Sequence, residues 1–272
     1  MPIDSNTATV LLTRFNVKTG VIASPKIHAI DWLLGRLNLF ESVTLPAISA
    51  QTRPPDAWLV FFDEGMPDLI QDRIRALREK FSYLHPVYCA ELSSATYKAA
   101  IQQHVSDSAQ WLISTRIDND DAIHPSLLEQ VYDSAHPGRR EFINPLHGLI
   151  VAGPHAFRKR DASSPFISLS EPMTDFKTVW IDQHQRLKTH GTVRQLRLPD
   201  AWIQLVHGGN IANQVRGLRA RYYSIDMRIL PHALRSQLQP ESFLQLCLDN
   251  SLGAAVRYAR SAGRRIRRLW SQ

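Results

Sequence analysis

Apolar segments of strand length alternate with segments of helical spacing through the first half of the chain. The strand patterns are short runs such as AWLVFF at 57–62, whereas the helical patterns place apolar residues three and four positions apart. This alternation is typical of a mainly parallel sheet with helices on its faces. The predicted strands are 9–16, 57–62, 85–89 and 110–117, and the predicted helices are 31–42, 47–51, 68–81, 94–104 and 125–132.

The second half of the chain has a less regular pattern. Strands are predicted over 141–144, 146–151 and 202–206. Residues 154–172 are rich in Pro, Ser and basic side chains, so a loop is predicted there. A short helix is predicted over 210–219, and the chain from Pro240 onward is predicted to be mostly helical. We therefore predict an α/β domain over 1–220 with a helical C-terminal extension over 221–272.

The predicted strand 110–117 ends in an acidic cluster, Asp118, Asp120 and Asp121. Ligands of open α/β sheets bind at the carboxyl ends of the strands, so the cluster is predicted to lie at the binding edge. Three carboxylates so close together are unfavourable unless solvent or a cation screens them. Asp118 and Asp120 can direct oxygens at one Mg²⁺ or Mn²⁺ ion, which would bridge the protein to a diphosphate. The alternative is a solvated loop with Asn119 in a turn.

Two arginines and two further polar residues are predicted at the same edge of the sheet. Arg14 and Asn16 end the first strand, Asp63 follows the second, and Arg116 precedes the acidic cluster. The arginines can clamp diphosphate oxygens, or they can form ion pairs with the cluster in the ligand-free protein. Asp63 can accept hydrogen bonds from a base or a ribose, or it can be a turn residue before Gly65.

Two other residues are candidates for chemistry. His207 directly follows the predicted strand 202–206 and precedes two glycines, so its neutral imidazole can complete a metal site. The alternative for His207 is an ordinary polar residue at a strand end. Glu171 follows an apolar segment that can raise its pKa, which makes it the candidate general base, with Asp182 and His184 as second choices. The alternative for Glu171 is an exposed loop glutamate.

The charge of the chain is concentrated at one end. The 272 residues include 32 Lys and Arg against 25 Asp and Glu, but six arginines and no acidic residue lie in 254–272. The body is therefore nearly neutral, and no nucleic-acid partner is expected, because such a partner requires a basic face on the folded body.

Only two cysteines occur, without CxxC spacing, which argues against a disulfide scaffold or a zinc ribbon. The chain shows neither a signal sequence nor an apolar run of ~18 residues, so a cytoplasmic protein is predicted.

Four segments resemble the bacterial glycosyltransferases called "putative rhamnosyltransferases", for which a GT-A fold is expected. The resemblance extends from about Thr9 to Arg216. TRxDNDD and HGGN are fairly specific as a pair, although each is weak alone. The four segments are Leu12–Asn16, the stretch from Leu39 to Gln51, Thr115–Asp121 and Val206–Asn210.

The resemblance implies transfer of a sugar from a nucleotide-sugar donor to an acceptor hydroxyl. It implies that Asp118 and Asp120 hold Mn²⁺ or Mg²⁺ on the donor diphosphate, with Asp120 the direct ligand and His207 completing the site. Asp63 would contact the nucleoside, and Asp121 would face the acceptor or the donor sugar. An inverting reaction would also need a base, for which Glu171 is the candidate, whereas a retaining reaction would not.

The basic tail suggests a membrane partner. Apolar residues of 252–272 recur at helical intervals between the arginines, a pattern suited to an anionic membrane surface. Peripheral attachment at the inner face of the membrane would agree with a lipid-linked or surface-glycan acceptor. A helix packed on the body, or a solvated tail, is the alternative.

Two other functions remain open on the sequence: a metal-dependent hydrolase or phosphotransferase acting on a nucleotide diphosphate, and a non-catalytic module that binds nucleic acid or anionic membranes.

Overall fold

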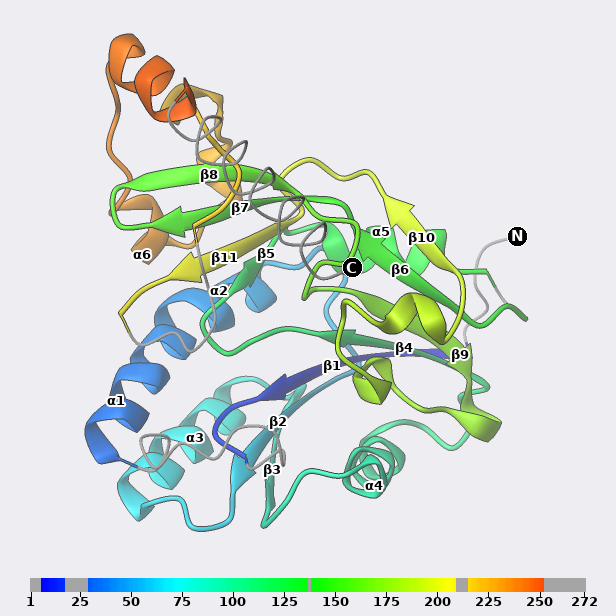
Figure 1. Cartoon of the computed structure of the whole chain (residues 1–272). Coiled ribbons are helices and arrows are strands. Elements are labelled where there is room, and N and C mark those ends of the chain that lie inside the picture. Colours follow the sequence, from blue (N-terminus) through cyan, green and yellow to red (C-terminus); the bar gives the residue numbers. More distant parts are fainter. Residues whose placement is uncertain (1–5, 18–28, 137, 209–214, 252–272) are drawn as a thin grey trace, which may run out of the picture.

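The computed structural model describes residues 6–17, 29–136, 138–208 and 215–251. Its main sheet has seven strands in the order β10-β6-β9-β4-β1-β2-β3, as Figure 1 shows. The four strands β4-β1-β2-β3 pair in parallel, whereas β9 is antiparallel to both of its neighbours. The strands are β1 (Thr7–Arg14), β2 (Ala57–Asp63), β3 (Leu84–Cys89), β4 (Trp111–Arg116), β6 (Glu141–Pro145), β9 (Ser168–Pro172) and β10 (Val193–Leu196).

Helices cover both faces of this sheet. All seven residues of β2 are buried, because its side chains alternate between two hydrophobic cores. One core includes side chains of α1, α3 and α5, and the other includes side chains of α4. The helices are α1 (Ile30–Leu39), which continues as a π-helix (Phe40–Thr44) into α2 (Leu45–Ser49), then α3 (Asp68–Lys80), α4 (Ser94–His104) and α5 (Leu127–Ser134). The predicted α/β fold, with a mostly parallel sheet flanked by helices, is confirmed.

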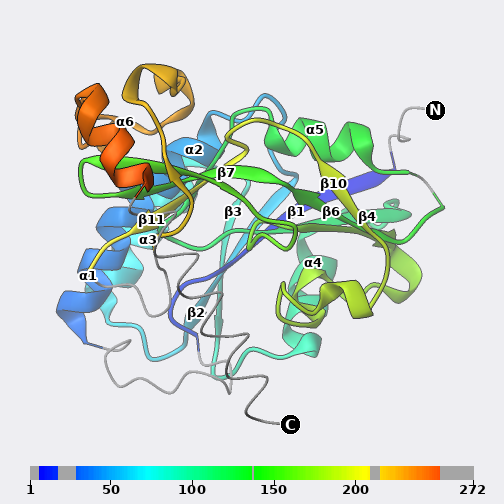
Figure 2. The ribbon, with the colours of Figure 1, turned by 45° about the horizontal axis from the view of Figure 1, so that its top comes forward.

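A second sheet of five strands, in the order β12-β8-β7-β11-β5, lies beside the first. Figures 1 and 2 both place the carboxyl end of β11 next to α1. Gly148 of β7 is in register with Trp202 of β11, and a Cβ atom at Gly148 would lie 2.0 Å from the Trp202 ring. The strands are β5 (Ala122–Ile123), β7 (His147–Ala152), β8 (His155–Arg160), β11 (Trp202–Val206) and β12 (Leu218–Arg219).

The prediction of a loop over 154–172 was wrong, because this segment contains β8 and β9. The strand β8 follows β7 as a hairpin through Gly153, whose φ of +54° suits a tight turn. The strand β9 is buried although it carries Ser168, Ser170 and Glu171, and its polar composition concealed it. The predicted helix over 210–219 lies largely outside the described residues, and its end forms β12 instead.

The chain after β12 packs first on the second sheet and then forms a helix over 243–251. Apolar residues of 225–238 share a core with β7 and β11. This segment has two 3-10 turns (Tyr222–Ser224 and Met227–Ile229) and α6 (His232–Arg235). Within the described part of the chain, no helix is long and apolar enough to cross a membrane. The predicted amphipathic tail over 252–272 lies outside the described residues.

Candidate active site

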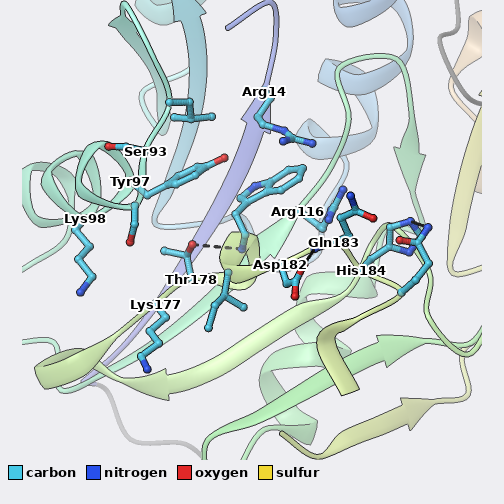
Figure 3. A pocket seen from close by; sticks show the side chains of 15 residues that line it. Arg14, Ser93, Tyr97, Lys98, Arg116, Lys177, Thr178, Asp182, Gln183 and His184 are labelled. Atoms are coloured by element: carbon cyan, nitrogen blue, oxygen red, sulfur yellow. Dashed lines mark hydrogen bonds between the residues drawn. The ribbon is translucent and has the colours of Figure 1, made fainter. Parts of the chain in front are cut away.

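A pocket of about 730 Å³ opens at the carboxyl ends of β1 and β4. Arg14 is the last residue of β1 and Arg116 is the last residue of β4, so the parallel pairing of these strands brings both side chains to one edge. The start of α4 contributes Ser93 and Tyr97, and the segment around the 3-10 turn Val179–Ile181 forms the opposite wall. Figure 3 shows Arg14, Tyr97 and Arg116 around this pocket. This edge is where open α/β sheets bind ligands.

The two arginines share an aromatic neighbour and form no ion pair with a described acidic residue. The Cζ atom of Arg14 lies 3.6 Å from the centre of the Trp180 ring, and that of Arg116 lies 3.7 Å from it. Among the described residues, neither guanidinium group makes a hydrogen bond or an ion pair, and the Nε atom of Arg116 is buried without a partner. The predicted alternative, ion pairs from these arginines to the acidic cluster, is therefore not what the structure contains.

Burial makes this pocket electrostatically unusual. Arg116 is only 6% exposed, and burial lowers its pKa to about 10, helped by the positive charge of Arg14 and opposed by Asp118. The Tyr97 hydroxyl is also buried and has no hydrogen-bond partner in the described part of the chain, and burial raises its pKa. A pocket with two unpaired guanidinium groups and an unpaired hydroxyl is suited to a negatively charged ligand.

The wall that carries Trp180 is held in a strained conformation. Thr178 has φ of 66° and ψ of 161°, a region that residues other than glycine rarely adopt. Its backbone N–H donates to Glu171 Oε1 at 2.8 Å, and the N–H of Lys177 donates to Glu171 Oε2 at 3.0 Å. The N–H of Val179 donates to Ser114 of β4 at 2.9 Å. Such a strained conformation persists only where surrounding contacts hold it. Here the hydrogen bonds to Glu171 and Ser114 hold one wall of the pocket in place.

The predicted base Glu171 is not brought to the acidic cluster. It pairs in register with Leu112 near the start of β4, at the opposite end of that strand from Asp118. Its side chain is fully buried, both oxygens accept backbone N–H groups, and Arg140 lies 3.4 Å away. Burial raises the pKa of Glu171, although the two N–H groups act against this. Glu171 therefore positions the Lys177–Thr178 wall, and its role as a general base stays a prediction.

The two second-choice residues do line the pocket. Asp182 accepts a hydrogen bond from His190 at 2.9 Å, and this contact lowers the pKa of Asp182. His184 contacts the carbonyl oxygen of Ser163 through Nδ1, and burial lowers the pKa of its ring. At neutral pH the pocket thus contains a carboxylate and a neutral imidazole.

The acidic cluster lies beside α1 and the end of β11. The guanidinium group of Arg36 donates from Nη1 to Asp120 Oδ2 at 2.6 Å and from Nη2 to Asn119 Oδ1. His207 Nε2 lies 3.0 Å from the same Asp120 oxygen and 3.3 Å from Arg36 Nη1. Contacts with His207 and Arg36 lower the pKa of Asp120 against the effect of burial. The structure therefore brings Asp120 and His207 together, as the sequence predicts.

Asp121 and Asp118 occupy different surroundings from Asp120. Asp121 is completely buried, and its Oδ1 accepts the backbone N–H of Leu205 in β11 at 2.9 Å. Burial, together with the charges of Asp120 and Asp118, raises the pKa of Asp121 well above its usual range. Asp118 is half-buried, and its charge acts on Arg116 and His184. In the described part of the chain, no three His, Cys, Asp or Glu side chains are grouped so that they could hold a metal ion.

Asn16 and Asp63 contact each other but do not line the pocket. The N–H of Asp63 donates to Asn16 Oδ1 at 3.0 Å, and Asp63 Oδ1 accepts the N–H of Gly65 at 2.9 Å. Asp63 thus has the turn geometry of its alternative interpretation. Its contact with a nucleoside stays a prediction.

Arg36 was missed by the sequence analysis. The available signal was its position: it lies three residues after Leu33 and four before Phe40, on a helical face whose other members are buried. A charged residue at such a position requires a partner.

Comparison with known proteins gives a family and distant structural neighbours. A family model described as "Putative rhamnosyl transferase" matches residues 10–219. The S. aureus TarS fragment 1–349 is 11% identical with a TM-score of 0.42, and the likeness covers 73% of this chain and 60% of that one. The same fragment in complex with UDP-GlcNAc gives 11% identity, a TM-score of 0.42, and coverage of 75% and 60%. An inositol-1-phosphate CTP transferase from T. maritima is 14% identical with a TM-score of 0.36, covering 73% and 88%. No curated protein matches the sequence.

Proposed function

The chain belongs to the "Putative rhamnosyl transferase" family, as its motifs predict, and we propose that it transfers a sugar from a nucleotide-sugar donor to an acceptor hydroxyl. The observation that carries this proposal is the two guanidinium groups over Trp180, at the carboxyl ends of β1 and β4, which form no hydrogen bond or ion pair with any residue that the structure describes. A nucleotide sugar has a diphosphate whose negative charge matches this pair. The crystal structures of TarS with UDP and with UDP-GlcNAc show such ligands bound to a distant structural neighbour.

Three side chains of the pocket contact the donor in this proposal. Arg14 and Arg116 donate charge-assisted hydrogen bonds to the diphosphate oxygens. When the bond between the sugar and the diphosphate breaks, negative charge develops on the leaving nucleoside diphosphate, and both guanidinium groups stabilise it. The Tyr97 hydroxyl donates a hydrogen bond to the same ligand, which satisfies an otherwise unpaired group. Burial of these groups strengthens their interaction with the ligand.

For an inverting reaction, we propose Asp182 as the base that deprotonates the acceptor hydroxyl. Asp182 is ionised at neutral pH, lines the pocket, and is oriented by His190. His184 is the second candidate, since its neutral ring also lines the pocket. Asp182→Asn should abolish transfer and leave donor binding unchanged. If transfer persists in that variant but is lost in His184→Gln, the base is His184.

The C-terminal part of the chain is the basis on which we propose a lipid-linked or surface-glycan acceptor. The helix over 243–251 exposes Phe243 (78%), Leu244 (70%) and Leu248 (49%), and it leads directly into the arginine-rich segment. An apolar face followed by basic residues favours an anionic membrane surface. Sedimentation with anionic vesicles should fall when residues 254–272 are deleted. Unchanged sedimentation would remove this part of the proposal.

The proposed function is tested by calorimetric titration of nucleoside diphosphates and nucleotide sugars, with Arg14→Met beside wild type. Arg53→Met is the matched control, because Arg53 also lies over an aromatic ring, 3.5 Å from the centre of Tyr132, but does not line the pocket. We expect one nucleotide to bind wild type and Arg53→Met and to bind Arg14→Met at least about tenfold more weakly. Absence of binding by every nucleotide would refute the proposal. Donor breakdown that ignores all acceptors would favour a hydrolase.

A further inference from the structure

We propose that Arg36 is the resident cation of the acidic cluster, and that the nucleotide-sugar donor binds without a divalent metal ion. This inference rests on the function proposed above. It differs from the metal site that the sequence pattern predicts at Asp118, Asp120 and His207. The reasons are the contacts of Arg36, the number of ligands at the cluster, and the charges that face the pocket.

Arg36 contacts the two side chains that would begin a metal site. Its Nη1 atom lies 2.6 Å from Asp120 Oδ2 and 3.3 Å from His207 Nε2, and these two atoms are themselves 3.0 Å apart. The side chain of Arg36 is only 14% exposed and that of Asp120 only 3%. The second guanidinium nitrogen is bonded to Asn119, whose amide donates to the carbonyl oxygen of Phe15. The guanidinium group is therefore held in place at three points.

Two atoms that a metal would use, Asp120 Oδ2 and His207 Nε2, are already engaged in these contacts. If His207 Nε2 is protonated, it donates to Asp120 and has no lone pair. If it is unprotonated, its lone pair accepts a hydrogen bond from Arg36. In neither tautomer is Nε2 available to a metal ion. A divalent ion about 2.1 Å from Asp120 Oδ2 would also stand close to the positive charge of Arg36. Metal binding would thus require Arg36 to leave a buried, paired position.

The described side chains alone do not supply a complete set of metal ligands, so a divalent ion would depend on the donor phosphates and water for the rest. Asp121 is buried and bonded to the N–H of Leu205, and Asp118 acts on Arg116 and His184. No group of three His, Cys, Asp or Glu side chains in the described ranges could hold a metal ion. The task that a metal performs on a diphosphate, neutralising its charge, falls to Arg14 and Arg116, whose guanidinium groups form no hydrogen bond or ion pair within the described ranges.

The first test is the binding of Mn²⁺ alone, followed by electron paramagnetic resonance or calorimetry. Wild type and Arg36→Lys should show no saturable Mn²⁺ binding at millimolar concentration. Arg36→Ala should bind Mn²⁺ through Asp120 and His207, with water as the remaining ligands, and the double variant Arg36→Ala/Asp120→Asn should lose this binding. Saturable binding to wild type that Asp120→Asn abolishes would overturn the inference, as would a folded Arg36→Ala that gains no site. If circular dichroism shows that Arg36→Ala is unfolded, the comparison of wild type with Asp120→Asn decides.

The second test is the affinity for the donor in EDTA and in Mn²⁺. We expect the two dissociation constants of wild type to agree within about threefold. A donor that binds more than about tenfold better in Mn²⁺ would overturn the inference and leave the proposed function intact. If no nucleotide binds under either condition, the proposed function fails, and the Mn²⁺ measurement still decides whether Arg36 excludes a metal.

Discussion

Replacing Arg116 by Met should stabilise the protein and weaken its affinity for a nucleotide diphosphate. Arg116 is 6% exposed and forms no ion pair with a described residue, and burial lowers its pKa to about 10 although the charge of Asp118 opposes this. A lowering of this size corresponds to roughly 3 kcal/mol against the charged form in the folded state. Because the folded pKa lies below the unfolded one, this cost applies in full at neutral pH and decreases only as the pH rises above about 10.

The expected size of the effect follows from what Met retains. Met keeps most of the packing against Trp180 but loses the cation–π contact, which is worth about 1–2 kcal/mol. The net gain in the free energy of unfolding should be about 1–2 kcal/mol, or a rise of a few degrees in Tm. Affinity for the diphosphate should fall at least about tenfold, because a charge-assisted hydrogen bond is worth about 1.5–3 kcal/mol.

The assay is urea unfolding combined with calorimetric titration, with Arg53→Met as the control. Arg53, like Arg116, lies over an aromatic ring: its Cζ atom is 3.5 Å from the centre of the Tyr132 ring, and it does not line the pocket. Its replacement should leave nucleotide affinity unchanged. A destabilised Arg116→Met with unaltered nucleotide affinity would refute the reasoning, because it would make Arg116 a structural residue.

Three further predictions concern residues away from the two arginines. Gly148→Ala should destabilise the protein by about 1–3 kcal/mol in urea unfolding, because the new Cβ would lie 2.0 Å from the Trp202 ring; unchanged stability would contradict this packing. Glu171→Gln should cost about 1–3 kcal/mol, because one backbone N–H near Thr178 loses its acceptor; wild-type stability with lost turnover would instead support a catalytic role. Asp121→Asn should flatten the fall of Tm with rising pH above about 4, because only the folded state keeps this carboxyl protonated; an unchanged pH profile would disprove that.

The sheet and its helices were predictable because their signals are local. β2 is a continuous apolar run with both faces covered, and α4 begins after Ser93, whose side chain accepts the N–H of Thr96. Neither β8 nor β9 was predicted. β9 is buried through long-range pairing with β4 and β6, and its Ser168 and Ser170 side chains bond to Thr115 and Trp111 of β4, which are distant in sequence. Local composition contains no information about such partners.

The candidate site also contains features that the sequence predicted and features that it could not predict. The position of Arg14 and Arg116 at one edge follows from the parallel strands, and the sequence predicted it. The environment of Glu171 was not predictable, because burial in β9 and bonding to the Lys177–Thr178 backbone depend on the completed fold. An apolar neighbour raises the pKa of a carboxyl group, as the sequence argument held, but it does not place that group at a reacting atom.

The acidic cluster requires a nearby cation, but its residues do not determine which cation that is. Asp120 contacts His207, and Asp121 bonds to Leu205, so two consecutive residues after β4 reach the end of β11 and connect the two sheets. Such a connection buries carboxyl groups, and each responds differently: the pKa of Asp120 is lowered by its partners, and that of Asp121 is raised. Electrostatics near Asp120 therefore demands a positive charge, which the motif alone predicts. Arg36 can supply it from 84 residues earlier in the chain, because the packing of α1 brings this side chain to the end of β11. A short acidic motif consequently predicts a cation site in a fold of this kind, and only the helix packed against it determines whether that cation is a metal ion or an arginine.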